Sequence, residues 1–115
     1  MLGMSVTHQF NISISPFEAL SLVKAGLGEN TELIHEELNN LGSDQSIGTM
    51  IFERYFHRSG NQAGLVVNID NLQGVTNVRL IAVGSSGSKY FKIDWGAGES
   101  FASSVEKILS SYIID

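Results

Sequence analysis

The sequence predicts a single α+β domain over residues 1–115, with an antiparallel sheet in the order β-α-β4-α and both helices packed on one face. Two observations support this prediction. In several segments the apolar residues recur at every second position, which is the period of a half-buried strand. In a segment near each end they recur at the spacing of a helix. A length of 115 residues fits one domain of this kind.

The first strand is predicted over residues 5–14 and is followed by a helix. The side chains expected to point inward from the strand are Val6, His8, Phe10, Ile12 and Ile14. Ser15 is placed to cap the helix, Pro16 to occupy its first position, and Glu18 to complete a capping box. The apolar stripe expected on this helix consists of Phe17, Leu20, Val23 and Leu27.

Two interpretations are open for the segment Asn30–Leu41. Thr31 could cap a helix that carries Ile34 and Leu38 at helical spacing and stops at Gly42. A short strand over Glu32–Leu38 is the alternative. Composition alone favours the helix.

Three strands are predicted in the middle of the chain, over Ile47–His57, Ala63–Leu72 and Val75–Val83, because these runs are rich in β-branched and aromatic residues. The separators SGNQ and NLQG are short enough for hairpins, so we expect an antiparallel meander. The stretch GSSGS is expected to form a flexible loop, and Tyr90–Ile93 a short further strand.

The clearest helix is predicted over Glu99–Ile114. The residues expected on its buried side are Phe101, Val105, Ile108, Leu109 and Tyr112. Serines and charged residues, among them Ser103, Glu106 and Lys107, occupy the opposite side. This helix and the first one should together cover one face of the sheet.

Both faces of the predicted sheet carry apolar residues, whereas a half-solvated antiparallel sheet should have one plainly polar face. The residues expected on the uncovered face are Ile51, Tyr55, Val66, Ile81 and Val83. Covering about 400 Å² of such a surface would gain on the order of 10 kcal/mol before association costs. We therefore expect a homodimer through this face, with a different protein partner or a curled sheet around a ligand groove as alternatives.

Composition and charge oppose several classes of function. The chain has no cysteine, which excludes disulfides, a thiolate nucleophile and cysteine zinc sites. Its three histidines, His8, His35 and His57, form no ligand pair, so we expect no metal and no cofactor. The formal net charge of −5 argues against a nucleic-acid partner.

The chain is expected to be cytoplasmic and to have no membrane partner. Its first residues, MLGMSVTHQF, lack the basic and apolar regions of a signal peptide. No apolar run approaches the roughly 20 residues that a membrane helix needs.

A small-molecule site is the alternative function, placed in a groove between sheet and helices. An anionic metabolite would be held by Glu53, Arg54, Tyr55 and Lys89. Glu53 and Arg54 are sequence neighbours and face opposite sides of a strand, so they cannot be the acid and base of one active site. A structural pair of Glu53 with Arg79 on a neighbouring strand is the simpler interpretation. The Gly-Ser loop lacks the spacing of a phosphate-binding loop, and the sequence offers no catalytic set, so we expect no enzyme.

Several motifs resemble a small family of uncharacterised proteins from Gram-positive bacteria. The matching positions are Phe52 to Tyr55, Gly60-Asn61, Gly84 to Gly87, Phe91 to Ile93 and Gly98-Glu99. The resemblance runs from about Ile47 to the C-terminus and implies a bacterial cytoplasm without an assigned activity, cofactor or partner. It also implies a strand over Thr31–Leu38. The order of elements is similar to TATA-binding-protein-like and helix-grip folds, a likeness that carries no function.

Overall fold

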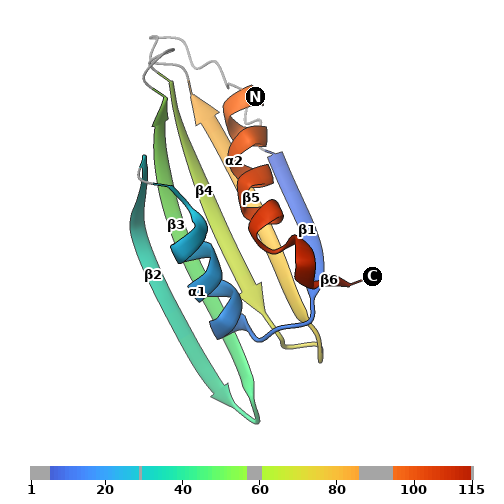
Figure 1. Cartoon of the computed structure of the whole chain (residues 1–115). Coiled ribbons are helices and arrows are strands. Elements are labelled where there is room, and N and C mark those ends of the chain that lie inside the picture. Colours follow the sequence, from blue (N-terminus) through green and yellow to red (C-terminus); the bar gives the residue numbers. More distant parts are fainter. Residues whose placement is uncertain (1–5, 29, 57–60, 86–94, 115) are drawn as a thin grey trace, which may run out of the picture.

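The computed structural model of the chain describes residues 6–28, 30–56, 61–85 and 95–114 (Figure 1). The elements in order are β1 (Val6–Ile12), α1 (Pro16–Gly26), β2 (Thr31–Gly42), β3 (Gln45–Phe56), β4 (Asn61–Asp70), β5 (Thr76–Ser85), α2 (Trp95–Ile108), the 3-10 helix η1 (Ser110–Tyr112) and β6 (Ile113–Ile114). The predicted α+β class is confirmed. The order differs from the prediction by the terminal strand β6.

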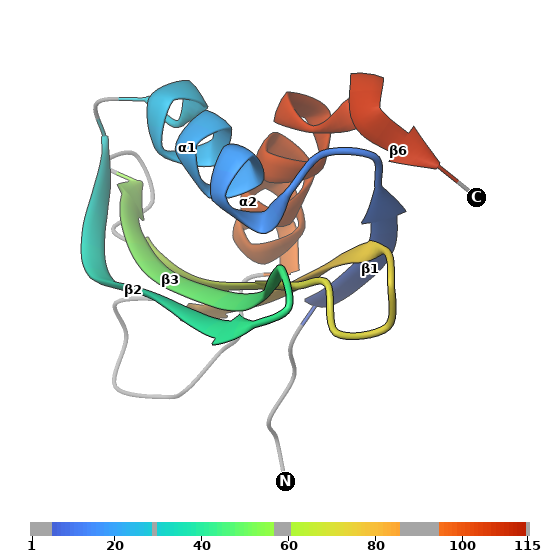
Figure 2. The same ribbon diagram turned by 90° about the horizontal axis from the view of Figure 1, so that it is seen from below.

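The sheet has six strands in the order β2-β3-β4-β5-β1-β6, and every neighbouring pair is antiparallel. The predicted meander is formed by β3, β4 and β5, and β1 pairs with β5. Figure 2 shows that the sheet curves around α1 and α2, which both lie on its concave side. The prediction that the helices share one face is therefore confirmed, and no described helix covers the convex side.

The core fills the space between the concave face and the helices. The sheet contributes Met50, Phe52, Ala63, Leu65, Val67, Ile69, Val78, Leu80 and Ala82, each 3% exposed or less. The helices contribute Ala19, Leu20, Val23, Phe101, Ala102 and Val105. These sheet residues alternate along each strand with residues of the convex face, as the two-residue period of a strand requires.

The first helix begins as the sequence indicates. The Ser15 hydroxyl accepts a hydrogen bond from the Glu18 backbone N–H, and the Glu18 carboxylate accepts one from the Ser15 backbone N–H, so the capping box is complete. The expected stripe is wrong at one position, because Phe17 is 63% exposed. Pro16, Ala19, Leu20 and Val23 face the sheet instead, which turns Phe17 outward on the helix.

The segment 31–42 is a strand, and the helix interpretation of it is wrong. β2 pairs with β3 along nearly its full length, and the hairpin closes at Ser43 and Asp44, whose φ values of 53° and 65° are positive. A two-residue hairpin loop with positive φ at both positions has a backbone twist that matches the twist of the flanking strands. Pairing with β3 outweighs the local helical pattern, and the side chain of Ile34 is exposed.

The last helix is shorter than predicted at its C-terminal end. α2 ends at Ile108, and Ile113–Ile114 form β6, which pairs with Asn11 and Ile12 of β1. The backbone N–H of Ser13 donates to the Tyr112 carbonyl over 2.9 Å, which fixes this turn on the end of β1. The predicted short strand at Tyr90–Ile93 and most of the Gly-Ser loop lie outside the described residues.

Within the described residues, neither α1 nor α2 combines the length and the apolar character that crossing a bilayer requires.

Glycines set how closely α1 approaches its neighbours. A Cβ atom on Gly48 of β3 would collide with Cδ1 of Leu20 on α1, and its next contacts would be Leu20 Cγ at 3.3 Å and Leu38 Cδ1 at 3.4 Å. A Cβ atom on Gly26 would lie 2.7 Å from Ile108 Cδ1 of α2. Close contact of α1 with both β3 and α2 therefore depends on positions without side chains.

We predict that Gly48→Ala destabilises the fold by about 1–3 kcal/mol, because the added methyl group displaces the buried Leu20 side chain. The matched control is Gly64→Ala on the adjacent strand β4, where the new Cβ would meet Val83 Cγ2 at an ordinary 3.6 Å. The control should be nearly neutral. Urea unfolding of both variants measures the difference, and equal stabilities would contradict the close approach at Gly48.

Candidate functional site

The convex face of the sheet carries three aligned apolar side chains across its three central strands. Ile51 of β3 is directly opposite Val66 of β4, and Val66 is directly opposite Ile81 of β5. Directly opposed residues of neighbouring strands point to the same face. Each of the three side chains is only half-buried, because its strand neighbours shield its sides and nothing described covers its end.

Two further apolar residues flank these three side chains on the same face. Val83 of β5 is 51% exposed and Tyr55 of β3 is 42% exposed. The structure therefore gathers all five residues of the predicted interface on one surface, called here the apolar row. Figure 2 shows that the convex side of the sheet faces away from α1 and α2.

The other half of the convex face is polar, so the apolar surface is smaller than a whole sheet face. Thr49 Oγ1 donates to Asn68 Oδ1 over 2.7 Å between β3 and β4. Arg79 Nη2 lies 3.8 Å from Asp70 Oδ2. The uncovered face is therefore mixed.

The four predicted ligand residues do not form one site. Glu53 and Tyr55 lie on the convex face, and Lys89 lies outside the described residues. Arg54 is on the helix side, where its Nε donates to Thr31 Oγ1 over 3.0 Å and its guanidinium lies 4.5 Å from the Phe101 ring centroid. Burial lowers the pKa of Arg54, which remains a cation because its ordinary value is so high.

The predicted pair of Glu53 with Arg79 is wrong. The register sets Glu53 opposite Gly64 on β4 and opposite Glu32 on β2. Arg79 is opposite Asn68 instead and faces Asp70. Strand register could not be obtained from the sequence, and it decides which charges meet.

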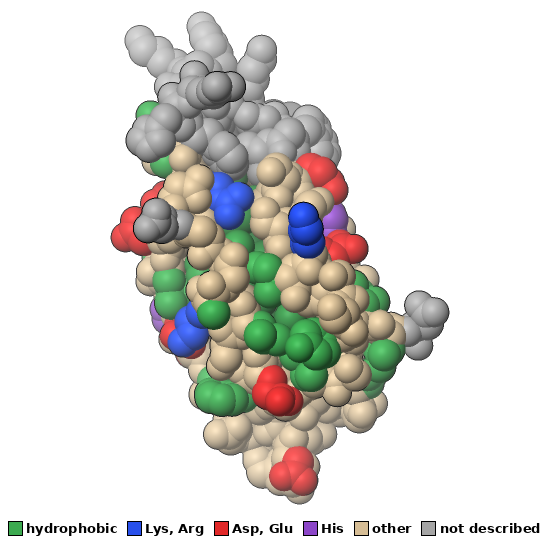
Figure 3. Space-filling view, in the orientation of Figure 1, with side chains coloured by type: hydrophobic (Ala, Val, Ile, Leu, Met, Phe, Trp, Pro, Cys, Tyr) green, Lys and Arg blue, Asp and Glu red, His purple; other side chains and the backbone are tan. Residues whose placement is uncertain are grey.

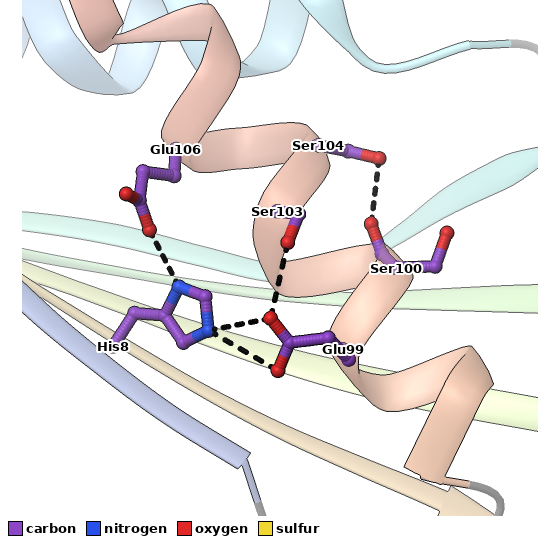
Figure 4. A network of polar contacts seen from close by, with 6 residues as sticks. All are labelled: His8, Glu99, Ser100, Ser103, Ser104 and Glu106. Atoms are coloured by element: carbon purple, nitrogen blue, oxygen red, sulfur yellow. Dashed lines mark hydrogen bonds and ion pairs between the residues drawn. The ribbon is translucent and has the colours of Figure 1, made fainter.

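A polar cluster that the sequence did not predict joins β1 to α2 (Figure 4). His8 projects from β1 toward the helix, and its Nδ1 lies 2.5 Å from Glu106 Oε1. Its Nε2 lies 3.3 Å from Glu99 Oε2. The Ser103 hydroxyl donates to the same Glu99 oxygen over 3.3 Å.

Carboxylates at both ring nitrogens favour the doubly protonated imidazolium of His8. Burial is the largest single influence and acts to lower the pKa of His8. The hydrogen bonds and charges of Glu106 and Glu99 together outweigh it, so the pKa is raised above 6.5. Because Ser103 donates to Glu99 and not to His8, no hydroxyl is activated as a nucleophile. The cluster therefore fastens β1 to α2 and does not resemble a catalytic triad.

One signal for this cluster was present in the sequence. His8 is the polar exception among the inward residues of its strand, and a polar group on such a face requires a partner. Glu99, Ser103 and Glu106 recur at helical spacing and share one side of α2. Which strand faces that side of the helix depends on the tertiary packing, which the sequence did not supply.

A second exposed apolar surface lies on the helix side of the molecule, between α1 and η1 (Figure 3). Its depression has a volume of about 410 Å³ and is lined by Ile14, Phe17, Glu18, Ser21, Leu22 and Tyr112. This surface competes with the apolar row as a place for contact with another molecule. It also supplies a control position, Phe17, for testing the row.

In the described ranges, no group of three His, Cys, Asp or Glu side chains is arranged to hold a metal ion. Comparison with protein families matches residues 6–113 to a family of unknown function, DUF6054. No curated protein and no solved structure matches the chain. The likeness to TATA-binding-protein-like folds and the Gram-positive origin therefore stay predictions.

The raised pKa of His8 predicts a pH-dependent contribution to stability. A group whose pKa is higher in the folded state stabilises fully below its unfolded value, near 6.5, and loses this effect as the pH rises through the folded value. We predict that His8→Gln is more destabilising at pH 5.5 than at pH 8.5. The difference should be below about 1 kcal/mol, because both carboxylates are partly exposed.

Urea unfolding at both pH values measures this difference. The control is His35→Gln, which changes an exposed histidine whose Nε2 lies 3.4 Å from Glu37 Oε2 and should cost little stability at either pH value. A loss for His8→Gln that is equal at both pH values, or larger at pH 8.5, contradicts an imidazolium held between Glu99 and Glu106.

Proposed function

The chain belongs to the family of unknown function DUF6054, and we propose from its structure that it is a non-catalytic domain that self-associates through the apolar row of its convex sheet face. The observation that carries the proposal is the register that aligns Ile51, Val66 and Ile81 across the central strands. A contiguous apolar surface without a described cover is a feature of interaction sites. A second copy is the occupant that is always present, and two-fold dimers are the commonest oligomers.

A two-fold axis parallel to β4 would pair the row with itself. Val66 would then meet Val66 of the second copy, and Ile51 would meet Ile81 of the second copy. Two sheets packed face to face keep their strands within about 30° of each other, and this arrangement satisfies that condition. Because both surfaces are convex, contact would be confined to β3, β4 and β5, where the row lies.

The charges at the β2 edge support a contact restricted to the centre of the face. Glu32 of β2 is directly opposite Glu53 of β3, and both side chains are exposed. Directly opposed like charges repel, and burying them under a second copy would add desolvation. We therefore expect Glu32 on the β2 edge to stay in water, and Glu53 of β3 to lie at the rim of the contact.

The expected dimer is weak. Covering about 400 Å² of apolar surface, half of it on each copy, gains on the order of 10 kcal/mol. Association costs about 4–15 kcal/mol, and a cost at the lower end of this range leaves about 6 kcal/mol. We expect a Kd on the order of 10 µM.

The alternative site between sheet and helices receives no support from the described residues. The side chains at that position form the packed core and are 3% exposed or less. A groove there would require α1 or α2 to move away from the sheet.

The proposal predicts a concentration-dependent dimer that Ile81→Asp converts to a monomer. Light scattering coupled to size exclusion, at about 100 µM and about 1 µM, brackets the expected Kd. Ile81→Thr keeps a β-branched side chain and should weaken the dimer if Ile81→Asp does not fold. Phe17→Asp changes an exposed apolar residue on the helix side and should leave the dimer intact.

A wild-type chain that is monomeric at about 100 µM contradicts the proposal. A dimer that Phe17→Asp disrupts and the Ile81 variants do not would assign the contact to the surface between α1 and η1.

A further inference from the structure

A polar pocket lies on the convex face, beside the turn between β4 and β5. Its volume is about 270 Å³, and its lining consists of Gln9, Asn11, Asp70, Gln73, Val75, Asn77 and Arg79. Small-molecule sites commonly measure about 300–1,000 Å³, so this pocket suits a small ligand. Six of its seven lining residues carry amide or charged side chains.

The sheet register brings these side chains together from three strands. Asp70, Asn77 and Asn11 form one row across β4, β5 and β1. Arg79 and Gln9 are directly opposed in the adjacent row. Because the strands are regular and their backbones are paired, the polar atoms of these five residues are held on a rigid scaffold, and Gln73 is added from the turn.

Hydrogen bonds within the lining fix part of the pocket before any ligand binds. Asn77 Oδ1 accepts from Gln9 Nε2 over 3.2 Å, and Asn77 Nδ2 donates to Asn11 Oδ1 over 2.9 Å. Asp70 Oδ1 accepts from the Leu72 backbone N–H over 3.1 Å, which orients the carboxylate. Ordering these groups in advance reduces the entropy lost on binding.

Several polar atoms of the pocket remain available. Arg79 Nη2 and Asp70 Oδ2 are 3.8 Å apart, which is too long for a direct hydrogen bond. Arg79 is 46% exposed, and its guanidinium makes no other hydrogen bond or ion pair within the described part of the chain. The side chain of Gln73 makes no hydrogen bond to the described residues. The pocket therefore offers donors on Gln73 and Arg79, and a carboxylate oxygen that is held only in a long ion pair.

The balance of charge identifies the class of ligand. Asp70 would repel an anion from Arg79, and Arg79 would repel a cation from Asp70, so the pocket has no formal net charge. Amides, a guanidinium and a carboxylate together present donors and acceptors side by side. Hydroxyl groups both donate and accept, and neighbouring hydroxyls on a ring match such a lining. Val75 adds one apolar contact for the C–H groups of a ring.

We propose that this pocket binds a small, neutral, polyhydroxylated molecule of monosaccharide size. Binding should be weak, with a Kd on the order of 1 mM, because a small ligand on an open face makes few contacts. None of its lining residues belongs to the apolar row, although Asp70, Asn77 and Arg79 lie on strands that the proposed dimer also uses.

Titration of the full-length chain with glucose, galactose and mannose, followed by amide NMR shifts, tests the proposal. At least one sugar should produce saturable shifts centred on Gln9, Asn11, Gln73, Asn77 and Arg79. Arg79→Met, which keeps the aliphatic stem, should weaken binding about tenfold or more, as removal of a charged hydrogen-bond donor does. Gln73→Ala, in the exposed turn, should weaken sugar binding several-fold. This variant replaces Arg79→Met in the test if Arg79→Met does not fold.

Thr7→Ala is the control, because Thr7 lies on the same face opposite Ile81 and outside the pocket. It should bind as the wild type does. Absence of saturable shifts with all three sugars up to about 50 mM overturns the proposal, since a Kd near 1 mM would give near-complete saturation there. Saturable binding of inorganic phosphate at the same residues, lost in Arg79→Met, overturns it in favour of an anion site.

The same titration in Ile81→Asp separates this inference from the proposed dimer. The sugar-induced shifts should persist in that variant. If these shifts are lost while the variant remains folded, the result contradicts a pocket that binds sugar without the dimer. That result does not contradict the proposed dimer.

Discussion

Two short helices pack against the same side of one curved sheet, and this packing determines which face of the sheet is buried. α1 and α2 bury most of the concave side of β3, β4 and β5, and close contact at Gly48 and Gly26 brings α1 against both β3 and α2. Both helices lie on that side, so no described helix covers the convex face. Its division into a polar half and an apolar row is the outcome for this chain, and both functional proposals follow from that division.

Local patterns in the sequence were sufficient for much of the fold. The capping box at Ser15 and the alternation in β3, β4 and β5 depend on residues close in sequence, so they could be predicted. β2 could not be obtained from composition, because its helical spacing is overruled by pairing with β3. The early end of α2 at Ile108 was missed for the same reason, since Ile113–Ile114 gain a partner in β1 that only the tertiary fold provides.

The candidate sites depend even more strongly on tertiary pairing that the sequence does not show. Alternation divided the residues of each strand between two faces, and the prediction that Ile51, Val66 and Ile81 share a face depended on register. Register was required to show that they are directly opposed, that Glu53 faces Glu32, and that Arg79 belongs to a polar pocket. His8 illustrates the general difficulty, since its two carboxylate partners are more than 90 residues away in sequence.

Contact between Ile51 of one copy and Ile81 of another is the decisive observation for the proposed dimer. Within one chain β4 separates these residues by about 10 Å, since adjacent strands lie about 4.8 Å apart. A mixed sample of isotope-labelled and unlabelled chains, measured by an isotope-filtered NOE experiment, reports only contacts between copies. The account predicts cross-peaks between the methyl groups of Ile51 and Ile81 and between those of the two Val66 residues. Cross-peaks confined to the surface around Phe17, or none in a concentrated sample, would contradict it.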